Sequence, residues 1–482
     1  MHGRLPAASI VRVRRALIVL AAVAMLLSAA STAFAHAVLV SSSPTADAKL
    51  AASPPQVTLT FNEPVQLLRG TDASVVDSQG APVNSGPAAN GSDSRTVVIP
   101  LRPGLPDGTY TVKYQIIGAD SHVIPGVFVF GIGPGELGEP YFGSGSSGPT
   151  ETGPWGTSSR FLEMVGLGGL VGLLGFRWLV WGPAVGRSRG MRRTEEEAVL
   201  NWGRDSFWVG FGVFAIGAMI AEGYVLVVQS ATALGVGVWS ALRDTNGISQ
   251  VLNDTTFGSL VQLRGALLFA LFAIGAVLFI REYGSSGSPK PATVTGSKTA
   301  GAVMAALLVV VLGGIARQGH ASVAEYSNLQ VAAQAVHIVA VAVWIVGLAM
   351  VAIVMVRLPR IAPDAGPGLA ARVLSRFSLV ALVAVAVAIL TGVIRTLGEL
   401  SDPAELWDTG YGRSILYKVA LLIPIGVIAL YNRRIVEALR DVPRPNGPTL
   451  RLIRRTASTE LVLSVVIVVI ASVLAAQVPG GA

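Results

Sequence analysis

The sequence predicts a chain of two parts, a small all-β domain followed by an all-α bundle of about eight membrane-spanning helices. Three observations lead to this fold class. Of the 482 residues, 52% are hydrophobic and only 13% are charged, whereas about a quarter of the residues of a soluble protein are charged. Short β-branched runs occupy the chain before residue 135. Beyond them lie eight apolar stretches, each about long enough to cross a bilayer.

Residues 1–35 have the order of a secretory signal peptide. Four arginines precede an apolar run over 16–30, and the small-residue sequence A-F-A follows at 33–35. Cleavage there makes His36 the first residue of the mature chain, while the alternative is an uncleaved first membrane anchor. The difference matters chemically, because a free α-amine beside an imidazole can close a chelate ring on a metal and a peptide nitrogen cannot.

Residues 36–134 are predicted to form a small β-sandwich. Turn-forming Pro, Gly, Asn and Asp separate six β-branched runs, which are HAVLVSSSP, QVTLTFNEPV, ASVVDSQG, SRTVVIPL, GTYTVKYQIIG and VIPGVFVFGIG. Residues 135–157 are rich in Gly, Ser and Pro and have no apolar period, which is typical of a linker. The domain boundary is therefore expected in this linker, and residues 158–482 form the membrane domain.

The eight predicted membrane helices cover 158–182, 206–229, 258–281, 299–317, 329–356, 376–396, 414–432 and 458–477. Basic residues are concentrated in the loops after the first, third, fifth and seventh helices, which indicates that these loops are cytoplasmic. An even number of helices then returns the C-terminus to the outer side, where a secreted N-terminal domain also lies. We expect a multi-pass protein of the bacterial cytoplasmic membrane with both ends outside.

Composition and motifs exclude several kinds of function. The sequence contains no cysteine, so a metal site must use His, Asp, Glu, Met or backbone groups. The net charge is +8, and the basic residues lie in short loops between apolar runs. This placement indicates how the helices are oriented in the membrane and not a nucleic-acid partner. The sequence contains no G-x-x-x-x-G-K-[ST] loop, so nucleotide binding is not expected. Neither G-x-S-x-G nor H-E-x-x-H occurs, so no catalytic residue is assigned and an enzyme is not expected.

The candidate metal ligands of the β-domain are His36, Asp120 and His122. Asp120 and His122 follow a predicted strand, and alternation places residues i and i+2 on one face. Together with the amine and imidazole of His36 they make a nitrogen-rich, roughly square site of the kind that Cu(II) prefers, with Ni(II) as the competitor. A D-x-H motif alone is weak, because Asp and His are common near turns, and the second histidine at the mature N-terminus strengthens it.

The β-domain resembles the CopC family of copper-resistance proteins. The resemblance rests on H-A at 36–37, S-S-S-P-T-A-D-A at 41–48, L-T-F-N-E-P-V at 59–65, A-D-S-H at 119–122 and P-G-V-F-V-F-G-I at 125–132. It implies an immunoglobulin-like or cupredoxin-like sandwich in which His36, Asp120 and His122 bind Cu(II). Some members of the family carry a Met-rich loop for Cu(I), but this domain contains no methionine, so we expect it to bind Cu(II) only.

The membrane half resembles the CopD family, in the fused arrangement in which a CopC domain precedes it. The looser motifs that carry this resemblance are R-Q-G-H-A at 317–321, A-V-H-I-V-A-V-A-V-W at 335–344, L-T-G-V-I at 390–394 and Y-G-R-S-I-L-Y-K at 411–418. The resemblance implies a protein that moves copper across the inner membrane, commonly inward.

Ionisable residues inside the predicted helices are costly and therefore mark functional or structural sites. His320 and His337 lie near the outer surface and form a candidate second copper site. A candidate membrane route for Cu(II) or Cu(I) further includes Glu163, Glu222, Met164 and Met219. The alternative to a route is ion pairing between helices, with Glu222 paired to Arg264 and Lys418 paired to Glu163.

The sequence thus predicts a protein that binds Cu(II) outside the membrane and takes part in copper import, homeostasis and resistance. Its expected partners are the copper ion, membrane lipid, and a copper chaperone or reductase outside the membrane. One alternative is an electron-transfer protein in which His320 and His337 ligate haem. Another is a copper sensor or storage module whose helices only anchor it.

Overall fold

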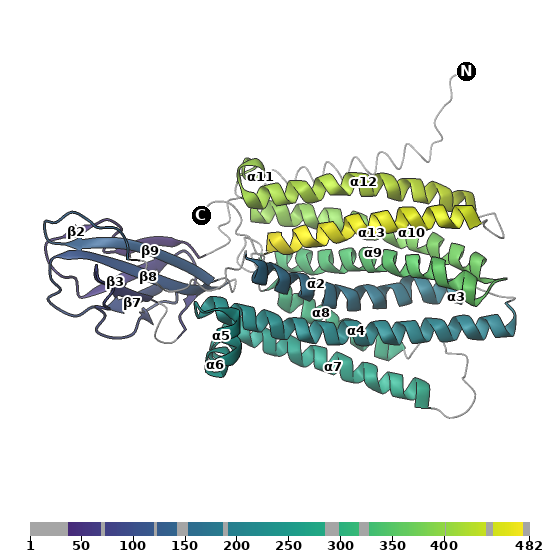
Figure 1. Cartoon of the computed structure of the whole chain (residues 1–482), viewed down its shortest axis with the longest axis horizontal. Coiled ribbons are helices and arrows are strands. Elements are labelled where there is room, and N and C mark those ends of the chain that lie inside the picture. Colours follow the sequence, from purple (N-terminus) through teal and green to yellow (C-terminus); the bar gives the residue numbers. More distant parts are fainter. Residues whose placement is uncertain are drawn as a thin grey trace, which may run out of the picture.

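The computed structural model describes residues 37–68, 73–119, 123–141, 153–186, 191–284, 298–317, 327–400, 402–439 and 447–475. These residues form a β-domain and a bundle of long helices, and the β-domain lies at one end of the bundle (Figure 1). We call this end of the bundle the β-domain end and the opposite one the far end. The predicted order, a β-domain followed by a helical membrane part, is confirmed.

The β-domain consists of two facing sheets. The first has the order β1 (Leu39–Ser43), β3 (Gln56–Phe61), β7 (Thr96–Pro100) and β6 (Ala89–Asn90). The second has the order β2 (Lys49–Leu50), β9 (Val123–Ile132), β8 (Gly108–Gly118) and β4 (Val65–Gln66), with β5 (Ala73–Val76) also paired to β8. Alternate residues point inward and are fully buried, for example Val57 and Leu59 of β3 and Val97 and Ile99 of β7. This alternation is what the sequence pattern of a half-exposed sheet predicts.

Eight long helical segments correspond to the eight predicted spans. They are α2 (Pro154–Gly175) with its continuation through the π-helix η1 (Phe176–Trp181) and α3 (Gly182–Val185), α4 (Arg193–Ala233), α7 (Thr256–Gly284), α8 (Lys298–Ala316), α9 (Ser327–Ile361), α10 (Gly366–Glu399), α12 (Gly410–Leu439) and α13 (Gly447–Ala475). By length and composition, six of these segments can cross a membrane, and α8 and α13 contain the shorter apolar helices Ala300–Ala316 and Ser458–Leu474. The chain is therefore a multi-pass membrane protein, and the number of helices in the described residues roughly fits the expected eight.

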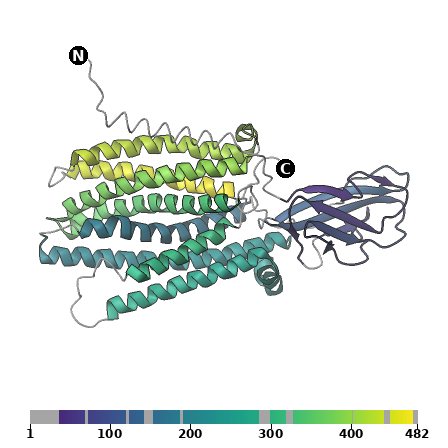
Figure 2. The same cartoon turned by 180° about the vertical axis from the view of Figure 1, so that it is seen from behind.

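The helices of the bundle divide into two sides. In both views, α10, α12 and α13 lie along one side and α4 and α7 along the other, with α2 and α9 between them (Figures 1 and 2). The short helices α5 (Val238–Arg243), α6 (Thr245–Asp254) and α11 (Glu405–Asp408) lie at the β-domain end. Buried polar residues occur on both sides of the bundle, and they are described below.

Helices α2 and α4 approach each other closely at Gly166. A Cβ atom added at this glycine would lie 2.8 Å from both the backbone nitrogen and the Cα of Ala218 on α4, closer than real Cβ atoms come. The contact involves backbone, so it cannot be relieved by rotating a side chain. The close approach of the two helices thus requires glycine at this position, one turn beyond Glu163.

We expect Gly166→Val to destabilise the bundle, because the new side chain must push α2 away from α4. Overpacking of this kind costs about 1–3 kcal/mol, and thermal unfolding of the detergent-solubilised protein would show a lower midpoint. A matched control is Gly217→Ala on α4, where an added Cβ meets no atom within 4 Å. Equal midpoints for the two variants would contradict the proposed close contact.

The β-domain contacts the bundle through an apolar group of residues that we call the docking cluster. Leu68, Ile117 and Val123 contribute to it from the β-domain. The buried residues that the helices contribute are Val225, Ala233, Val251, Phe257 and Val261. The end of the β8–β9 hairpin where Ile117 pairs with Val123 therefore rests on α4, α6 and α7.

Two glutamines add specific polar contacts at this interface. Gln66 Nε2 donates a hydrogen bond to Thr256 Oγ1 (2.9 Å), and its Oε1 accepts one from Thr256 N (3.1 Å). Gln115 Nε2 donates to the carbonyl oxygens of Thr232 and Ala233, the latter at 3.1 Å. The last carbonyls and first N–H groups of a helix have no partner within it. The β-domain thus supplies partners to the end of α4 and to the beginning of α7.

Candidate functional site

The predicted ligands His36, Asp120, His122 and His320 lie outside the described residues, so their site stays a prediction. The strands before and after 120–122 are β8 and β9, and Ile117 of β8 and Val123 of β9 are part of the docking cluster. Among the residues that the structure does describe, no three His, Asp or Glu side chains are grouped so that they could hold a metal ion.

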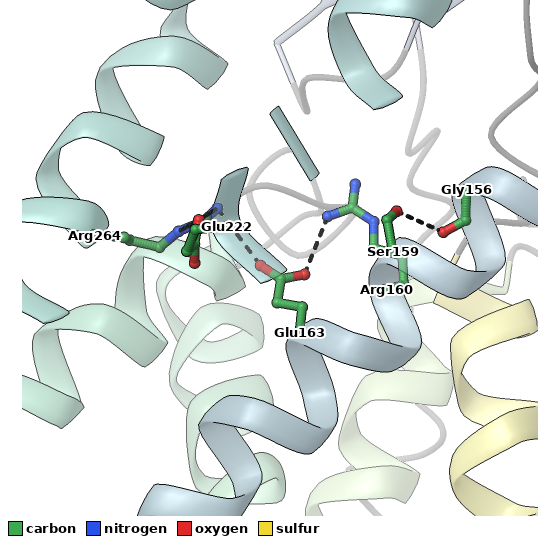
Figure 3. A network of polar contacts seen from close by, with 6 residues as sticks. All are labelled: Gly156, Ser159, Arg160, Glu163, Glu222 and Arg264. Carbon is green, nitrogen blue, oxygen red and sulfur yellow. Dashed lines mark hydrogen bonds and ion pairs between the residues drawn. The ribbon is translucent and has the colours of Figure 1, made fainter. Parts of the chain in front are cut away.

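Glu163, Glu222 and Arg264 form a buried ionic network at the crossing of α2, α4 and α7 (Figure 3). The Arg264 guanidinium is fully buried, and its Nη2 lies 2.8 Å from Glu222 Oε2 and 3.5 Å from Glu163 Oε1. Arg160 lies on the other side of Glu163, with Nη1 3.5 Å from Oε2. The two carboxylates and two guanidiniums of this network balance in charge, which offsets the cost of burying them.

Of the two ion pairs that the sequence offered as an alternative to a copper route, the structure contains one and not the other in its described residues. Glu222 pairs with Arg264, as that alternative expects. The expected pair of Glu163 and Lys418 is wrong, because Glu163 pairs with Arg160 and Arg264. The sequence could not show this, since it does not say which helices are neighbours. On the remaining side, α8 covers the network: a Cβ added at Gly314 would lie 3.2 Å from Arg264 Cγ.

The two methionines of the candidate route lie near the network, and among the described residues neither makes a polar contact to it. Met219 packs against an apolar cluster that α2, α4, α7 and α8 share, and Met164 is half-buried on α2. In the described part of the chain, the structure brings Glu163 and Glu222 together through Arg264 and joins neither sulfur to them by a polar contact. A guanidinium between two carboxylates disfavours a cation at the same place.

His337 lies on α9 and is held by α10. Its Nδ1 is 2.9 Å from the carbonyl oxygen of Ala388 and 3.0 Å from Thr391 Oγ1. A carbonyl oxygen only accepts, so in the neutral ring Nδ1 carries the proton and Nε2 keeps its lone pair. A histidine that binds a metal commonly donates its other ring N–H to a backbone carbonyl in this way. The contacts of His337 therefore suit a metal ligand.

Further polar residues continue from His337 toward the β-domain end along α9. Gln330, Gln334 and His337 are spaced i, i+4 and i+7, so they share one face of the helix. We call these three residues the α9 polar stripe. Gln330 Nε2 donates to the carbonyl of Ile394 (3.1 Å), while the side-chain oxygens of Gln330 and Gln334 are buried with no hydrogen-bond donor among the described residues. The stripe thus presents two amide oxygens and an imidazole in the interior of the helix bundle.

A second ionic group lies beside the stripe. Arg395 Nη2 is 2.7 Å from Glu399 Oε1, and the Tyr411 hydroxyl contacts Glu399 Oε2. Gln330, Gln334, Glu399 and Tyr411 are not among the site residues that the sequence predicts. The spacing of the two glutamines relative to His337 was the signal that could have found part of this group.

Comparison with known proteins identifies both halves of the chain. A family model described as CopC domain matches residues 39–133, and one described as Copper resistance protein D matches residues 371–474. Copper resistance protein C of Escherichia coli is 32% identical over 112 residues, which cover 22% of this chain and 88% of that protein. The chain belongs to the CopC and CopD copper-resistance family. The resemblance inferred from the sequence is thereby confirmed.

Two more proteins are similar to this chain. Copper transport protein CutJ of Bacillus subtilis (strain 168) is 26% identical over 397 residues, which cover 81% of this chain and 66% of that protein, slightly under two thirds. Protein YobA of Escherichia coli (strain K12) is 31% identical over 100 residues, 20% of this chain and 80% of that protein. The CopC match covers β1 to β9, and the CopD match covers α12 and most of α10 and α13. His337, on α9, precedes the CopD match.

Proposed function

We propose that this protein binds Cu(II) outside the cytoplasmic membrane and takes part in moving copper across it, in the inward direction. The observation that carries the proposal is His337, an imidazole inside a membrane helix. Its Nδ1 is held by Ala388, and its Nε2 has no hydrogen-bond partner among the described residues, so it can bind a metal. Membership of a copper-resistance family and similarity to a protein named for copper transport support copper as the metal.

The distribution of basic residues supports an outer β-domain. Arg193 begins α4, Arg281 is in the last turn of α7, Arg360 is in the last turn of α9 and Arg372 is in the first turns of α10. All of these helix ends lie at the far end of the bundle (Figure 1). Positive residues favour the cytoplasmic side, so we place the far end inside the cell and the β-domain and the C-terminus outside.

Capture of Cu(II) is assigned to His36, Asp120 and His122. Docking of the β8–β9 hairpin supports direct delivery to the helices, because Ile117 and Val123, on either side of 120–122, contact the β-domain end of the bundle. The membrane site is assigned to His337 together with His320. The α9 polar stripe then provides oxygen and nitrogen ligands along one face.

Glu163, Glu222, Met164 and Met219 are the other candidates for the route. A cation that entered between the two glutamates would have to displace Arg264, whose guanidinium already lies between them. We therefore propose the α9 polar stripe as the route and the Arg264 network as the scaffold that holds α2, α4 and α7 together.

The test is copper uptake by proteoliposomes that contain the purified protein, followed with a metal-sensitive dye inside. We expect His337→Ala to lower copper uptake by at least about tenfold, since the loss of a ligand costs more than the 10–100-fold effect of losing an outer partner of a metal. Cu(II) binding by the β-domain should stay unchanged. The matched control is Asn328→Ala, an exposed residue on the same helix.

Uptake by His337→Ala at the level of the control would contradict the assigned membrane site. Absence of copper uptake by the wild-type protein would contradict the transport function itself. A Soret absorption band that the wild-type protein has and His337→Ala lacks would assign the histidine to haem instead.

A further inference from the structure

Glu460 is a buried carboxylate that the sequence pattern did not single out and that no part of the proposed route uses. It is the 14th of the 29 residues of α13 and is 5% exposed. The other buried glutamates of the bundle have cationic partners: Glu163 and Glu222 pair with Arg264, and Glu399 pairs with Arg395. Among the described side chains, no cation lies within ion-pair distance of Glu460.

The groups that contact Glu460 are neutral hydrogen-bond donors from two other helices. The indole N–H of Trp344, on α9, donates to the carboxylate. Asn432 Nδ2, on α12, lies 3.4 Å from Oε2. Thr456, one turn earlier on α13, donates to the amide oxygen of Asn432 at 2.5 Å. Three helices therefore converge on one buried carboxyl group, near the start of the apolar part of α13.

Among the side chains that the structure describes, no charged group on the surrounding elements neutralises this carboxylate. The elements that pack against α13 are α2 (continued by η1), α9 and α12. The titratable residues that precede and follow the level of Glu460 on these elements are Glu163 and Arg177 on α2 and η1, His337 and Arg357 on α9, and Lys418, Tyr431 and Arg433 on α12, with Arg455 on α13 itself. No ion pair joins any of them to Glu460 in the described part of the chain. A buried, ionised carboxylate with no counter-charge is unfavourable, which favours its protonated form.

A proton satisfies this site better than a metal ion does. Both groups that reach the carboxylate point an N–H toward it, whereas a metal needs lone pairs. The described residues offer no second carboxylate or imidazole to complete a coordination sphere there. A proton needs no such set of ligands. It converts the carboxylate into a neutral acid, and the two N–H donors stabilise the anion when the proton leaves.

The position of Trp344 relates this carboxyl group to the proposed copper ligand. Trp344 follows His337 by seven residues, so both lie on the same face of α9, about 10 Å apart along the axis. We propose that Glu460 takes up a proton from one side of the membrane and releases it to the other in each transport cycle, which couples copper movement past His337 to proton movement. The buried carboxyl group changes between neutral and −1, and the proton comes from water and returns to water. This inference rests on the proposed transport function.

The experiment uses proteoliposomes with a copper-sensitive dye and a pH-sensitive dye inside. Wild-type protein is expected to change the internal pH when copper enters. Glu460→Gln keeps the shape of the protonated acid and cannot titrate, so we expect the copper-dependent pH change to fall at least about tenfold, to background. Glu460→Asp keeps a titratable group and should retain proton movement. The matched control is Glu196→Gln, at an exposed position on α4, which should behave as wild type.

The outcomes separate this inference from the proposed function. A pH change by Glu460→Gln equal to that of the control overturns the assignment of Glu460. Copper uptake by the wild-type protein without any proton movement overturns the coupling and leaves copper transport intact, whereas no copper uptake at all contradicts the transport function. If Glu460→Gln does not give a stable protein, the wild-type protein decides, because copper uptake that does not respond to a pH gradient across the membrane overturns the inference.

Discussion

Arg264→Met is expected to destabilise the protein by about 3–5 kcal/mol, because removing one partner of a buried ion pair leaves the other charge uncompensated. Here Glu222 loses its cationic partner, and Glu163 keeps only Arg160. The effect extends over three helices, since the network joins α2, α4 and α7 (Figure 3). Unfolding of the detergent-solubilised protein by heat or denaturant measures the loss.

Two further variants show whether charge is the cause. Adding Glu222→Gln to Arg264→Met removes the uncompensated carboxylate and should recover a large part of the lost stability. Arg281→Met, at an exposed position near the far end of the same helix, should change stability by no more than about 0.5 kcal/mol. If Arg264→Met were as stable as Arg281→Met, the network would have no structural role.

The second large effect is expected for Cu(II) binding at the mature N-terminus. In the full chain, one extra residue before His36 removes the α-amine from the chelate, and His122→Ala removes an imidazole. Each change should weaken Cu(II) binding by about 100-fold or more, because losing an outer partner of a metal already costs about 10–100-fold. Titration with a competing chelator, followed by the visible absorption of Cu(II), measures the affinity.

The controls for this experiment address the second histidine site. His337→Ala should leave the tight Cu(II) binding unchanged, because that residue lies in the membrane helices. Weak binding that responds neither to the extension nor to His122→Ala would rule out the proposed Cu(II) site. A copper function would then rest on the membrane histidines alone.

The sequence predicted the membrane helices well, because long apolar runs have few alternatives. The span expected at 258–281 is α7 (Thr256–Gly284), and that expected at 376–396 is the apolar part of α10 (Gly366–Glu399). Helix α4 begins at Arg193, well before the expected residue 206, because its first turns are polar and lie outside any apolar window. The short helices α5 and α6 were missed, since neither is long or apolar enough to predict.

The buried polar groups were predicted only in part. Glu222 and Arg264 could be paired from the sequence because few charged residues fall within the apolar runs. Pairing Glu163 correctly required knowing that α2 lies beside α4 and α7. Glu460 was missed because it lies near the start of its apolar run, where a charged residue resembles an ordinary helix end, and the structure shows that α13 extends to Gly447. Its depth in the bundle depends on that extension.

Docking of the β-domain through Gln66 and Gln115 has a kinetic consequence. A separate copper carrier at micromolar abundance meets its acceptor by diffusion, at a rate proportional to the number of molecules of each. Two sites on one chain meet at an effective concentration in the millimolar range when a short linker joins them, and contacts to the ends of α4 and α7 fix their orientation as well. The rate of delivery per molecule would then follow the occupancy of its own β-domain and would not depend on how many copies of the protein the membrane holds.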